Sequence, residues 1–307
     1  MNIVFMGTPE FAVPSLNILV SNGFNVSAVV TVPDKKQGRG LKMQNSAVKE
    51  FALNQKIEVL QPESLREPEF IYKLKSFKPD LFIIVAFRIL PPEVYKIPSR
   101  GAFNLHASLL PKYRGAAPIN WAIIKGEKET GVTTFFLQDK VDTGNILLQR
   151  KIEIKDSENA GTLHDKLSLL GANTVLDTVQ LIASDNLTTI YQDDKLATKA
   201  PKIFKEDCRI NWSKSDVITH NLIRGLSPYP AAFTTLEGKI VKIYESALTS
   251  YMCTDDTGSI SISGRKIFSC ASGKMLEIIE LQAEGKKRIK APDFINGLHK
   301  TSGLKFE

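Results

Sequence analysis

The stretch Leu81-Phe82-Ile83-Ile84-Val85-Ala86-Phe87, bounded by Asp80 and Arg88, is the longest apolar run in the chain. Its first six residues predict a strand, and because apolar and polar residues do not alternate, we expect both faces of that strand to be covered. Strands of this kind occur in parallel sheets whose connecting helices lie on the two faces. A helix that crosses a membrane needs about 20 residues, so this run predicts sheet structure and no membrane span.

Strand and helix patterns alternate on both sides of this run. Apolar runs predict further strands at residues 3–6, 26–32, 57–60, 103–107 and 132–137. Apolar residues at helical spacing predict helices at residues 13–20, 46–53, 70–77 and 162–184. Alternating strands and helices form doubly wound sheets, so we expect an α/β fold: a mostly parallel, Rossmann-like sheet with helices on both faces.

The last third of the chain has a different pattern. Residues 190–206 are polar and basic and include Pro201, which is typical of a linker. Beyond them, a helical pattern at residues 213–226 precedes five short strand patterns, at residues 232–236, 239–244, 259–262, 266–270 and 275–281. This combination is typical of a small β-barrel of the oligonucleotide-binding type (OB-like). We therefore expect one domain over residues 1–189, a basic linker over 190–206 and an OB-like domain over 207–307.

Composition limits the class of protein. The chain has 307 residues with 40 Lys+Arg and 33 Asp+Glu, a formal net charge of +7. Its 43% hydrophobic and 24% charged residues are typical of a globular protein and exclude a disordered or collagen-like chain. The positive charge favours an anionic partner without identifying it. Because no basic stretch precedes an apolar run at the start, we expect no secretory signal and predict a cytoplasmic protein.

Cysteine and motif counts exclude several kinds of site. Three cysteines lie far apart and form no CxxC pair: Cys208, Cys253 and Cys270. An odd number at wide spacing favours free thiols over a disulfide framework. The histidines other than His106 have no partners at metal-ligand spacing, so we expect no metal site. The missing G-x-G-x-x-G fingerprint disfavours a dehydrogenase.

Asn104 and His106 occupy alternate positions on the strand predicted at residues 103–107. Successive side chains of a strand point to opposite faces, so we expect these two to point the same way. Open α/β sheets bind ligands at the carboxyl ends of their strands. An amide can donate to a developing oxyanion and an imidazole can carry a proton, so the pair is a candidate catalytic site. The alternative is a structural histidine beside an asparagine that starts a turn.

Asp142 lies in the segment Lys140-Val141-Asp142-Thr143-Gly144, just after the strand predicted at residues 132–137. A carboxylate within reach of His106 would orient the imidazole, and it can accept a proton itself. The alternative is a turn aspartate that binds its own backbone.

Two basic segments are candidates for contacts with phosphates. The first, over residues 33–42, carries two glycines and four positive side chains: Lys35, Lys36, Arg39 and Lys42. The second contains Lys286-Lys287-Arg288. A solvated surface loop and a solubilising turn are the respective alternatives.

Ordered motifs extend along most of the chain. They are Met6-Gly7-Thr8-Pro9-Glu10-Phe11-Ala12, the Gly38-Arg39-Gly40 segment, Asn104-x-His106-x-Ser108-Leu109-Leu110-Pro111-x-x-Arg114-Gly115-Ala116-Ala117-Pro118-Ile119, Glu129-Thr130-Gly131-Val132-Thr133 with Asp142-Thr143-Gly144, Ile210-Asn211-Trp212 and Pro228-Tyr229-Pro230. Together they resemble the methionyl-tRNA formyltransferase family. The Asn-x-His…Asp core alone is shared with other folate-dependent formyltransferases, whereas the Gly-Thr-Pro segment and the basic C-terminal domain favour the tRNA-acting family.

The resemblance implies transfer of a formyl group from 10-formyltetrahydrofolate to the α-amino group of methionine on initiator methionyl-tRNA. It implies that Asn104, His106 and Asp142 are catalytic, and that Phe11 lies near the methionine side chain. The residues expected to bind folate are Ser108, Leu109, Leu110 and Pro111, with Arg88, Ile89 and Leu90 where many members have an aromatic–glycine pair. The residues expected to bind tRNA are Lys35, Lys36, Arg39, Lys42, Lys286, Lys287 and Arg288. No obligate protein partner is expected.

Other functions remain open from the residues themselves. The same scaffold can transfer a formyl group to an amino sugar or a ribonucleotide amine, or hydrolyse formylfolate. A non-enzymatic RNA-binding protein is the alternative of a different class. The residues also leave open whether Asp142 or a water molecule that it holds accepts the proton of the amine.

Overall fold

The computed structural model describes residues 1–37 and 42–307. The chain forms two compact units. The N-terminal unit comprises Met1–Gly115, Thr130–Ile152 and His164–Lys199, and the C-terminal unit comprises Ala116–Glu129, Glu153–Leu163 and Ala200–Glu307. This division differs from the three continuous segments expected from the sequence, because two short internal segments belong to the C-terminal unit.

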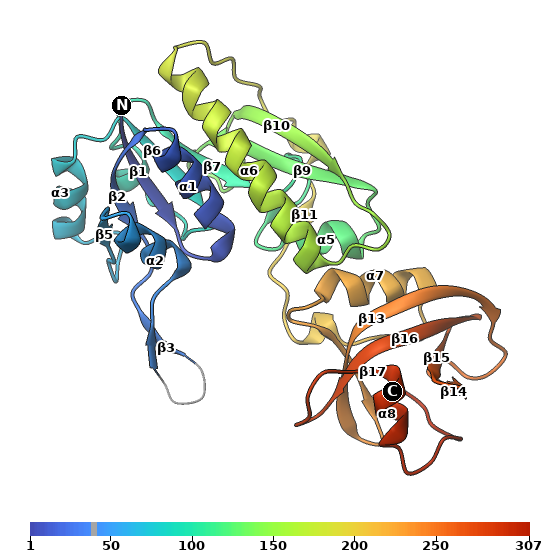
Figure 1. The fold of residues 1–307 in the computed structure, drawn as a ribbon. Helices are drawn as coiled ribbons and strands as arrows, with labels where there is room; N and C mark the ends of the chain where they lie inside the picture. Colours follow the sequence, from blue (N-terminus) through green and yellow to red (C-terminus); the bar gives the residue numbers. More distant parts are fainter. Residues whose placement is uncertain (38–41) are drawn as a thin grey trace. The chain divides into compact units, whose positions relative to one another are not determined.

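The N-terminal unit is built on a seven-stranded sheet with the order β10-β9-β7-β6-β1-β2-β5 (Figure 1). Its strands are β1 (Asn2–Gly7), β2 (Asn25–Val30), β5 (Glu58–Leu60), β6 (Leu81–Val85), β7 (Ala102–His106), β9 (Glu129–Phe136) and β10 (Ile146–Glu153). The five strands from β5 to β7 pair in parallel, whereas β9 runs antiparallel to β7. The expected mostly parallel sheet is therefore confirmed.

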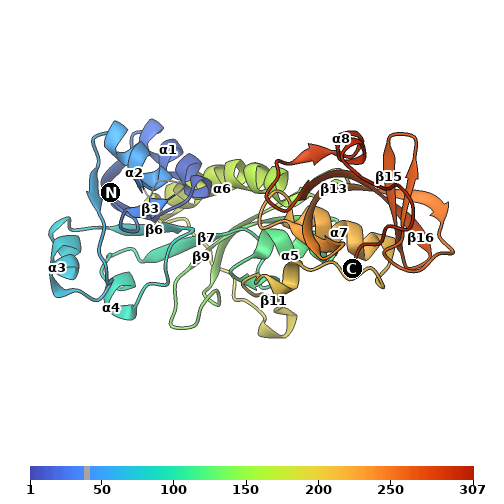
Figure 2. The same ribbon diagram turned by 90° about the horizontal axis from the view of Figure 1, so that it is seen from below.

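Helices cover both faces of this sheet, as the unbroken apolar run predicts. They are α1 (Val13–Ser21), α2 (Ala47–Asn54), α3 (Pro68–Ser76), the short α4 (Pro92–Tyr95) and the long α6 (Ala160–Ala183). Figure 2 shows α1 and α2 on one side of β6 and β7, and α3 and α4 on the other. All five residues of β6 are buried, because each of its faces packs against a layer of helices.

The helix boundaries follow local signals in the sequence. Ser46 caps α2, since its hydroxyl accepts a hydrogen bond from the backbone N–H of Lys49 at 3.1 Å. On α6, Gly171 lies directly against the side chain of Leu105, so the Leu105 side chain would have to shift to accommodate a larger residue there. A hydrogen bond of 2.8 Å between the hydroxyls of Thr134 and Thr178 also joins α6 to β9.

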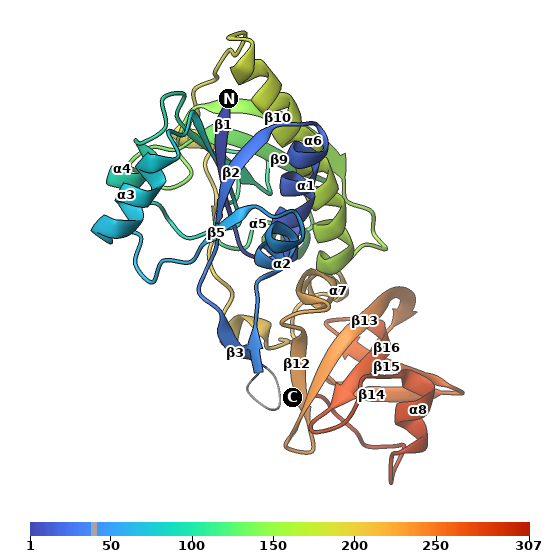
Figure 3. The same cartoon turned by 60° about the vertical axis from the view of Figure 1, so that its left-hand side comes forward.

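The basic segment at residues 33–42 overlaps a short antiparallel hairpin (Figure 3). Its strands are β3 (Lys35–Gln37) and β4 (Lys42–Gln44), so the segment is not an irregular loop throughout. Residues 38–41, which include Arg39, lie outside the described residues. At the base of the hairpin, the Asp34 carboxylate forms an ion pair with Lys49 at 2.5 Å and accepts a hydrogen bond from Gln61 at 2.8 Å. The Lys49 hydrogen bond lowers the pKa of Asp34 below its ordinary value.

The C-terminal unit contains an antiparallel sheet with the order β12-β13-β16-β15-β14, and β17 pairs with β16. Its elements are α5 (Pro118–Ile124), α7 (Asp216–Leu226), β12 (Ala232–Leu236), β13 (Lys239–Met252), β14 (Ile260–Ser263), β15 (Lys266–Ala271), β16 (Lys274–Ala283), β17 (Ile289–Lys290) and α8 (Ala291–Asn296). The five predicted strands and the predicted helix are all present. The expected fold class was a mostly parallel, Rossmann-like sheet with helices on both faces, followed by a small OB-like β-barrel. It is confirmed for the N-terminal sheet, and the C-terminal domain is built on the antiparallel sheet described above.

The last four residues of the chain join the two edge strands of this sheet. Thr235 of β12 and Glu307 exchange backbone hydrogen bonds of 3.1 and 2.9 Å. On the other edge, the N–H of Ile260 in β14 donates to the carbonyl of Leu304 at 2.9 Å. This pairing also buries Phe306, whose ring stacks on Trp212 with 5.4 Å between the ring centroids. The sequence patterns do not reveal this closing segment.

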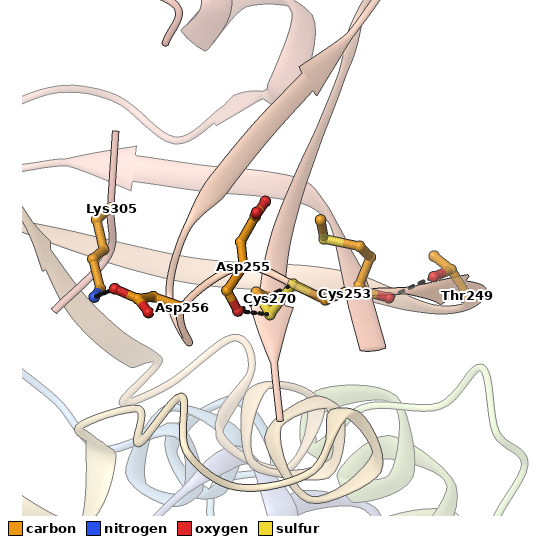
Figure 4. Close-up of a disulfide and its surroundings, with 7 residues drawn as sticks. Thr249, Cys253, Asp255, Asp256, Cys270 and Lys305 are labelled. Carbon is orange, nitrogen blue, oxygen red and sulfur yellow. Dashed lines mark hydrogen bonds and ion pairs between the residues drawn. A yellow bond between two sulfur atoms is a disulfide. The ribbon is translucent and has the colours of Figure 1, made fainter. Parts of the chain in front are cut away.

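Two of the three cysteines form a disulfide, so the expectation of three free thiols is wrong. The Cys253–Cys270 bond has an S–S distance of 2.06 Å and a Cα–Cα distance of 5.7 Å (Figure 4). It forms because the segment after β13 returns alongside β15, where the N–H of Gly258 donates to the carbonyl of Cys270 at 2.8 Å. Wide spacing in sequence does not reveal this proximity. Cys208 is a free thiol, and it is buried.

The stability of the C-terminal unit should depend on the protonation of His220 in α7. Its Nδ1 atom lies 2.9 Å from the hydroxyl oxygen of Ser246, and burial, reinforced by the nearby Arg224 charge, lowers the pKa of His220 from its ordinary 6.5. The unfolded chain therefore binds a proton at a higher pH than the folded chain does. We expect stability to fall as the pH drops below about 6.5, through the lower folded pKa. Thermal unfolding between pH 7.5 and 5 should show a smaller loss for His220→Gln, and equal losses would contradict this assignment.

Candidate active site

The site begins with His106 at the end of β7. Its imidazole is only 6% exposed, and Nε2 lies 2.8 Å from the carbonyl oxygen of Tyr113. Because a carbonyl can only accept a hydrogen bond, Nε2 carries the proton in this arrangement. In the neutral ring, Nδ1 is then the nitrogen that can accept a proton from a ligand.

Asn104 lies two residues earlier on the same strand, so it shares a face of the sheet with His106 and with Ala102. Ala102 belongs to the core that α3 and α4 cover, which fixes the side of the sheet toward which Asn104 points. Its amide has no hydrogen-bond partner among the described residues. Both N–H groups of the amide are therefore available to a ligand.

The position of Asp142 on this side of the sheet depends on the connection between β9 and β10, which the order of the strands alone does not predict. Because β9 runs antiparallel to β7, its carboxyl end lies beside the start of β7, with Phe136 opposite Phe103. The connection between β9 and β10 then carries Asp142 back, and the Asp142 carboxylate accepts a hydrogen bond from the N–H of Gly115 at 2.9 Å. The tyrosine hydroxyl of Tyr95, at the end of α4, donates to Asp139 of the same connection at 2.5 Å.

The short segment from Tyr113 to Gly115 joins the two titratable groups. Its first residue accepts from His106 and its last residue donates to Asp142. Two residues of chain span at most about 7 Å, so the imidazole and the carboxylate are anchored close together without a direct hydrogen bond between them. The arrangement offers an amide donor, a proton carrier and a carboxylate on one side of the sheet, which suits addition to a carbonyl carbon.

The Ser108–Pro111 segment is held by the interior of the sheet. Ser108 is fully buried, and its hydroxyl donates to the carbonyl of Lys112 at 2.6 Å. The hydroxyl of Thr133 donates to the Ser108 carbonyl at 2.6 Å and accepts from the N–H of Leu110 at 3.1 Å. Ser108 and the buried Leu110 therefore shape the segment, while Leu109 and Pro111 are partly exposed.

Arg88, Ile89 and Leu90 follow the end of β6 and have three different surroundings. Arg88 folds back and donates to the carbonyls of Glu63 and Pro62 at 3.0 and 2.9 Å. Leu90 is buried in the core beneath α3 and α4. Ile89 is 74% exposed, so of the three it is the apolar side chain that a ligand can reach.

Phe11 is buried in the short 3-10 helix Glu10–Ala12. Its carbonyl accepts a hydrogen bond from the hydroxyl of Ser168 at 2.9 Å, and its ring meets the edge of His164 with 5.1 Å between the centroids. Both partners lie on α6, so this helix fixes the position of Phe11.

The basic candidates differ in how much of their charge is free. Lys286, Lys287 and Arg288 are exposed. Arg288 forms an ion pair with Glu280 and lies over the ring of Tyr244, so much of its charge is compensated. Lys286 and Lys287 have no ion-pair partner within the described part of the chain. Lys35, Lys36 and Lys42 lie on β3 and β4, and Arg39 is outside the described residues.

Sequence reasoning missed Gln192 as a residue of this site. It is 1% exposed, although it lies in the polar segment taken as a linker, and it contacts the backbone of Asp142. Its partner Arg114 belongs to a quoted motif, but nothing local in the sequence indicates their contact.

Residues 1–37 and 42–307 lack two further features. No helix there is both long enough and apolar enough to cross a membrane. No group of three or more His, Cys, Asp or Glu side chains there has the geometry to hold a metal ion.

Comparison with known proteins defines the class. Residues 1–179 match the family model for formyl transferase, and residues 202–299 match that for the formyl transferase C-terminal domain. The fold also resembles a sugar 3N-formyl transferase solved with dTDP and 5-N-formyl-THF, with a TM-score of 0.71 and 21% identity over 94% of this chain and 99% of that one. The two family matches therefore define a formyl transferase with the N-terminal and C-terminal domains of that class.

Closer relatives identify the family within this class. The chain is 48% identical over 304 residues to the methionyl-tRNA formyltransferase of Flavobacterium johnsoniae, covering 97% of this chain and 96% of the relative. It is 49% identical over 301 residues to that of Clostridium novyi, covering 97% of each. The solved methionyl-tRNA formyltransferase from Clostridium thermocellum has the same fold, with a TM-score of 0.56 and 16% identity over 91% of this chain and 99% of that one. The chain belongs to the methionyl-tRNA formyltransferase family.

Proposed function

We propose that this protein transfers the formyl group of 10-formyltetrahydrofolate to the α-amino group of methionine on initiator methionyl-tRNA, in the cytoplasm. The observation that carries the proposal is the arrangement of Asn104, His106 and Asp142. These residues bring an amide, an imidazole and a carboxylate to one side of the sheet. The amide has no hydrogen-bond partner among residues 1–37 and 42–307, and the other two groups are anchored on the segment from Tyr113 to Gly115.

Each of these three side chains can carry out one step of the formyl transfer. An α-amino group has a pKa near 7.7–8.0, so an appreciable fraction is neutral and nucleophilic at pH 7. The Asn104 amide donates to the formyl oxygen as negative charge develops there. The proton that the amine loses goes to Asp142 or to a water molecule it holds. His106 first takes up a proton on Nδ1, becoming charged, and then passes that proton to the departing nitrogen as the bond to the formyl carbon breaks.

The residues around the site fit a folate. The exposed Ile89 offers an apolar contact beside the end of β6, and the partly exposed Leu109 and Pro111 follow β7. We propose that these three residues contact the folate directly. Ser108, Arg88 and Leu90 would then act by shaping the backbone, because their side chains are occupied by protein contacts or buried.

We propose that the tRNA is bound mainly through its phosphates. The formyl group is small, so most of the affinity for a macromolecule must come from elsewhere. The exposed Lys286 and Lys287 carry charges that no ion pair compensates within the described residues. The second proposed group comprises Lys35, Lys36 and Lys42 of the hairpin strands, together with Arg39, which lies outside the described residues.

The function is tested by offering 10-formyltetrahydrofolate with three acceptors in turn: initiator methionyl-tRNA, a dTDP-linked amino sugar and water. We expect formyl transfer to the tRNA alone. The KM for the tRNA should rise steeply with salt concentration, because phosphate contacts displace bound cations, while the KM for folate should change little. Transfer to the sugar alone, hydrolysis alone, or RNA binding without any turnover would each contradict the proposal.

A further inference from the structure

The Gln192 side chain makes all the hydrogen bonds that an amide can make. Its Nε2 donates to the carbonyl of Asp142 at 3.0 Å and to the carbonyl of Gly144 at 2.7 Å. Its Oε1 accepts two hydrogen bonds from Arg114, one from Nε at 3.1 Å and one from Nη2 at 2.8 Å. A buried amide whose donors and acceptors are all paired is fixed in one orientation.

The backbone conformation at Asp142 is unfavourable by itself and has to be stabilised by contacts with other segments. Asp142 has a φ of +56°, a left-handed conformation that costs a residue with a side chain roughly 1–2 kcal/mol. Such a conformation persists where its surroundings fix it. Gln192 binds the carbonyls on both sides of Thr143, so it fixes the backbone at Asp142 and the residue that ends the turn.

Arg114 links this support to the carboxylate itself. Its guanidinium is held between Gln192 and Asp194, with 2.8 Å to the Asp194 carboxylate. The next residue, Gly115, donates its N–H to the Asp142 side chain at 2.9 Å. Arg114 and Gly115 are consecutive residues. The first therefore orients the Gln192 amide, and the second binds the Asp142 carboxylate that this amide positions.

We propose that Gln192, oriented by Arg114, is a positioning residue that holds the Asp142 carboxylate in its reactive orientation. The inference rests on the proposed function, because it assumes that Asp142 takes part in formyl transfer. Gln192 does not touch the reacting atoms, and it acts through the backbone of the catalytic aspartate. Tyr95 holds the same connection at Asp139, and the Thr143 hydroxyl donates to the Lys140 carbonyl within the turn at 2.9 Å. Gln192 holds the turn from outside it, through the carbonyls of Asp142 and Gly144.

The test is a double-mutant cycle with Gln192→Met and Asp142→Asn. Methionine has nearly the length of glutamine but cannot make the four hydrogen bonds. We expect Gln192→Met to lower kcat by about 10- to 100-fold, since displacing a reacting group by about 1 Å costs that order, with little change in KM for either substrate. In the Asp142→Asn protein, where the carboxylate is already absent, the same change should lower single-turnover rates by less than about twofold.

A matched control replaces the exposed Gln180 of α6 with methionine, which should leave kcat unchanged. Thermal unfolding of every variant establishes that each is folded at the assay temperature. Equal losses from Gln192→Met in both backgrounds, or no loss in either, would overturn the positioning role while leaving the proposed function intact. Full activity of Asp142→Asn would instead overturn the role of the aspartate on which the inference rests, and absence of formyl transfer by the unaltered protein would overturn the proposed function.

Discussion

Asn104→Ala is expected to lower kcat for formyl transfer by about 10²–10³, the usual effect of removing one donor to a developing oxyanion. The change should leave KM for both substrates nearly unaltered, because the amide interacts most strongly with charge that exists in the transition state. Stability should change little, since the Asn104 amide has no hydrogen-bond partner among the described residues. Steady-state kinetics together with thermal unfolding measure both effects.

The control for this prediction is Asn173→Ala on α6. Asn173 is also an asparagine, but it is exposed, and its amide donates to the carbonyl of Leu169 within its own helix at 3.1 Å. We expect kcat to be unaltered in this variant. A folded Asn104→Ala protein with full kcat would show that the amide does not stabilise the transition state.

Gly144→Ala is expected to disrupt the connection that carries Asp142. Gly144 is buried, and a methyl group on its Cα would collide with the backbone carbonyl of Phe136. Backbone cannot move aside as a flexible side chain does, so the connection between β9 and β10 must shift. We expect a loss of about 1–3 kcal/mol in the free energy of unfolding from overpacking. The accompanying displacement of Asp142 should lower kcat by about 10².

Gly23→Ala separates the loss of stability from the displacement of the site. Gly23 has a φ of +77° at the end of α1, and an added Cβ there meets no atom within 4 Å. Alanine in this left-handed conformation costs roughly 1–2 kcal/mol, so the two variants should lose similar stability. Denaturant titration and kinetics should show that only Gly144→Ala loses kcat. An equal loss of kcat in both variants would mean that activity follows stability rather than the position of Asp142.

Buried parallel strands were predictable because their signal is local. Strands β1, β2, β6 and β7 are apolar runs that lie between two layers of helices, and the runs are evident without any partner. Strand β10 was missed, since several of its residues are exposed and polar, including Arg150 and Lys151. The closing segment at residues 304–307 was missed because it is short and only its pairing with β12 and β14 reveals it.

The residues of the candidate site differ in how much of their position could be predicted from the sequence. The sequence placed Asn104 and His106 side by side, because alternation along a strand is fixed by the backbone. The position of Asp142 marked it only as a polar residue after a strand, and the family resemblance alone implied its catalytic role. The direction of β9 is not contained in that strand's own residues. Gln192 was assigned to a linker, since a buried glutamine and a solvated one look the same in a polar segment.

The sequence by itself determined which runs become buried strands, which two polar side chains share a face of β7, and which family the chain resembles. The tertiary structure alone decided that Asp142 meets Gly115, that Gln192 holds the turn around Asp142, and that Cys253 meets Cys270. The physical reason is the range of the interactions. Strand burial and side-chain alternation arise from neighbouring residues. The contacts that bring Asp142 to Gly115 and Gln192 to Arg114 join residues 27 and 78 positions apart, and they form only when the sheet brings those segments together.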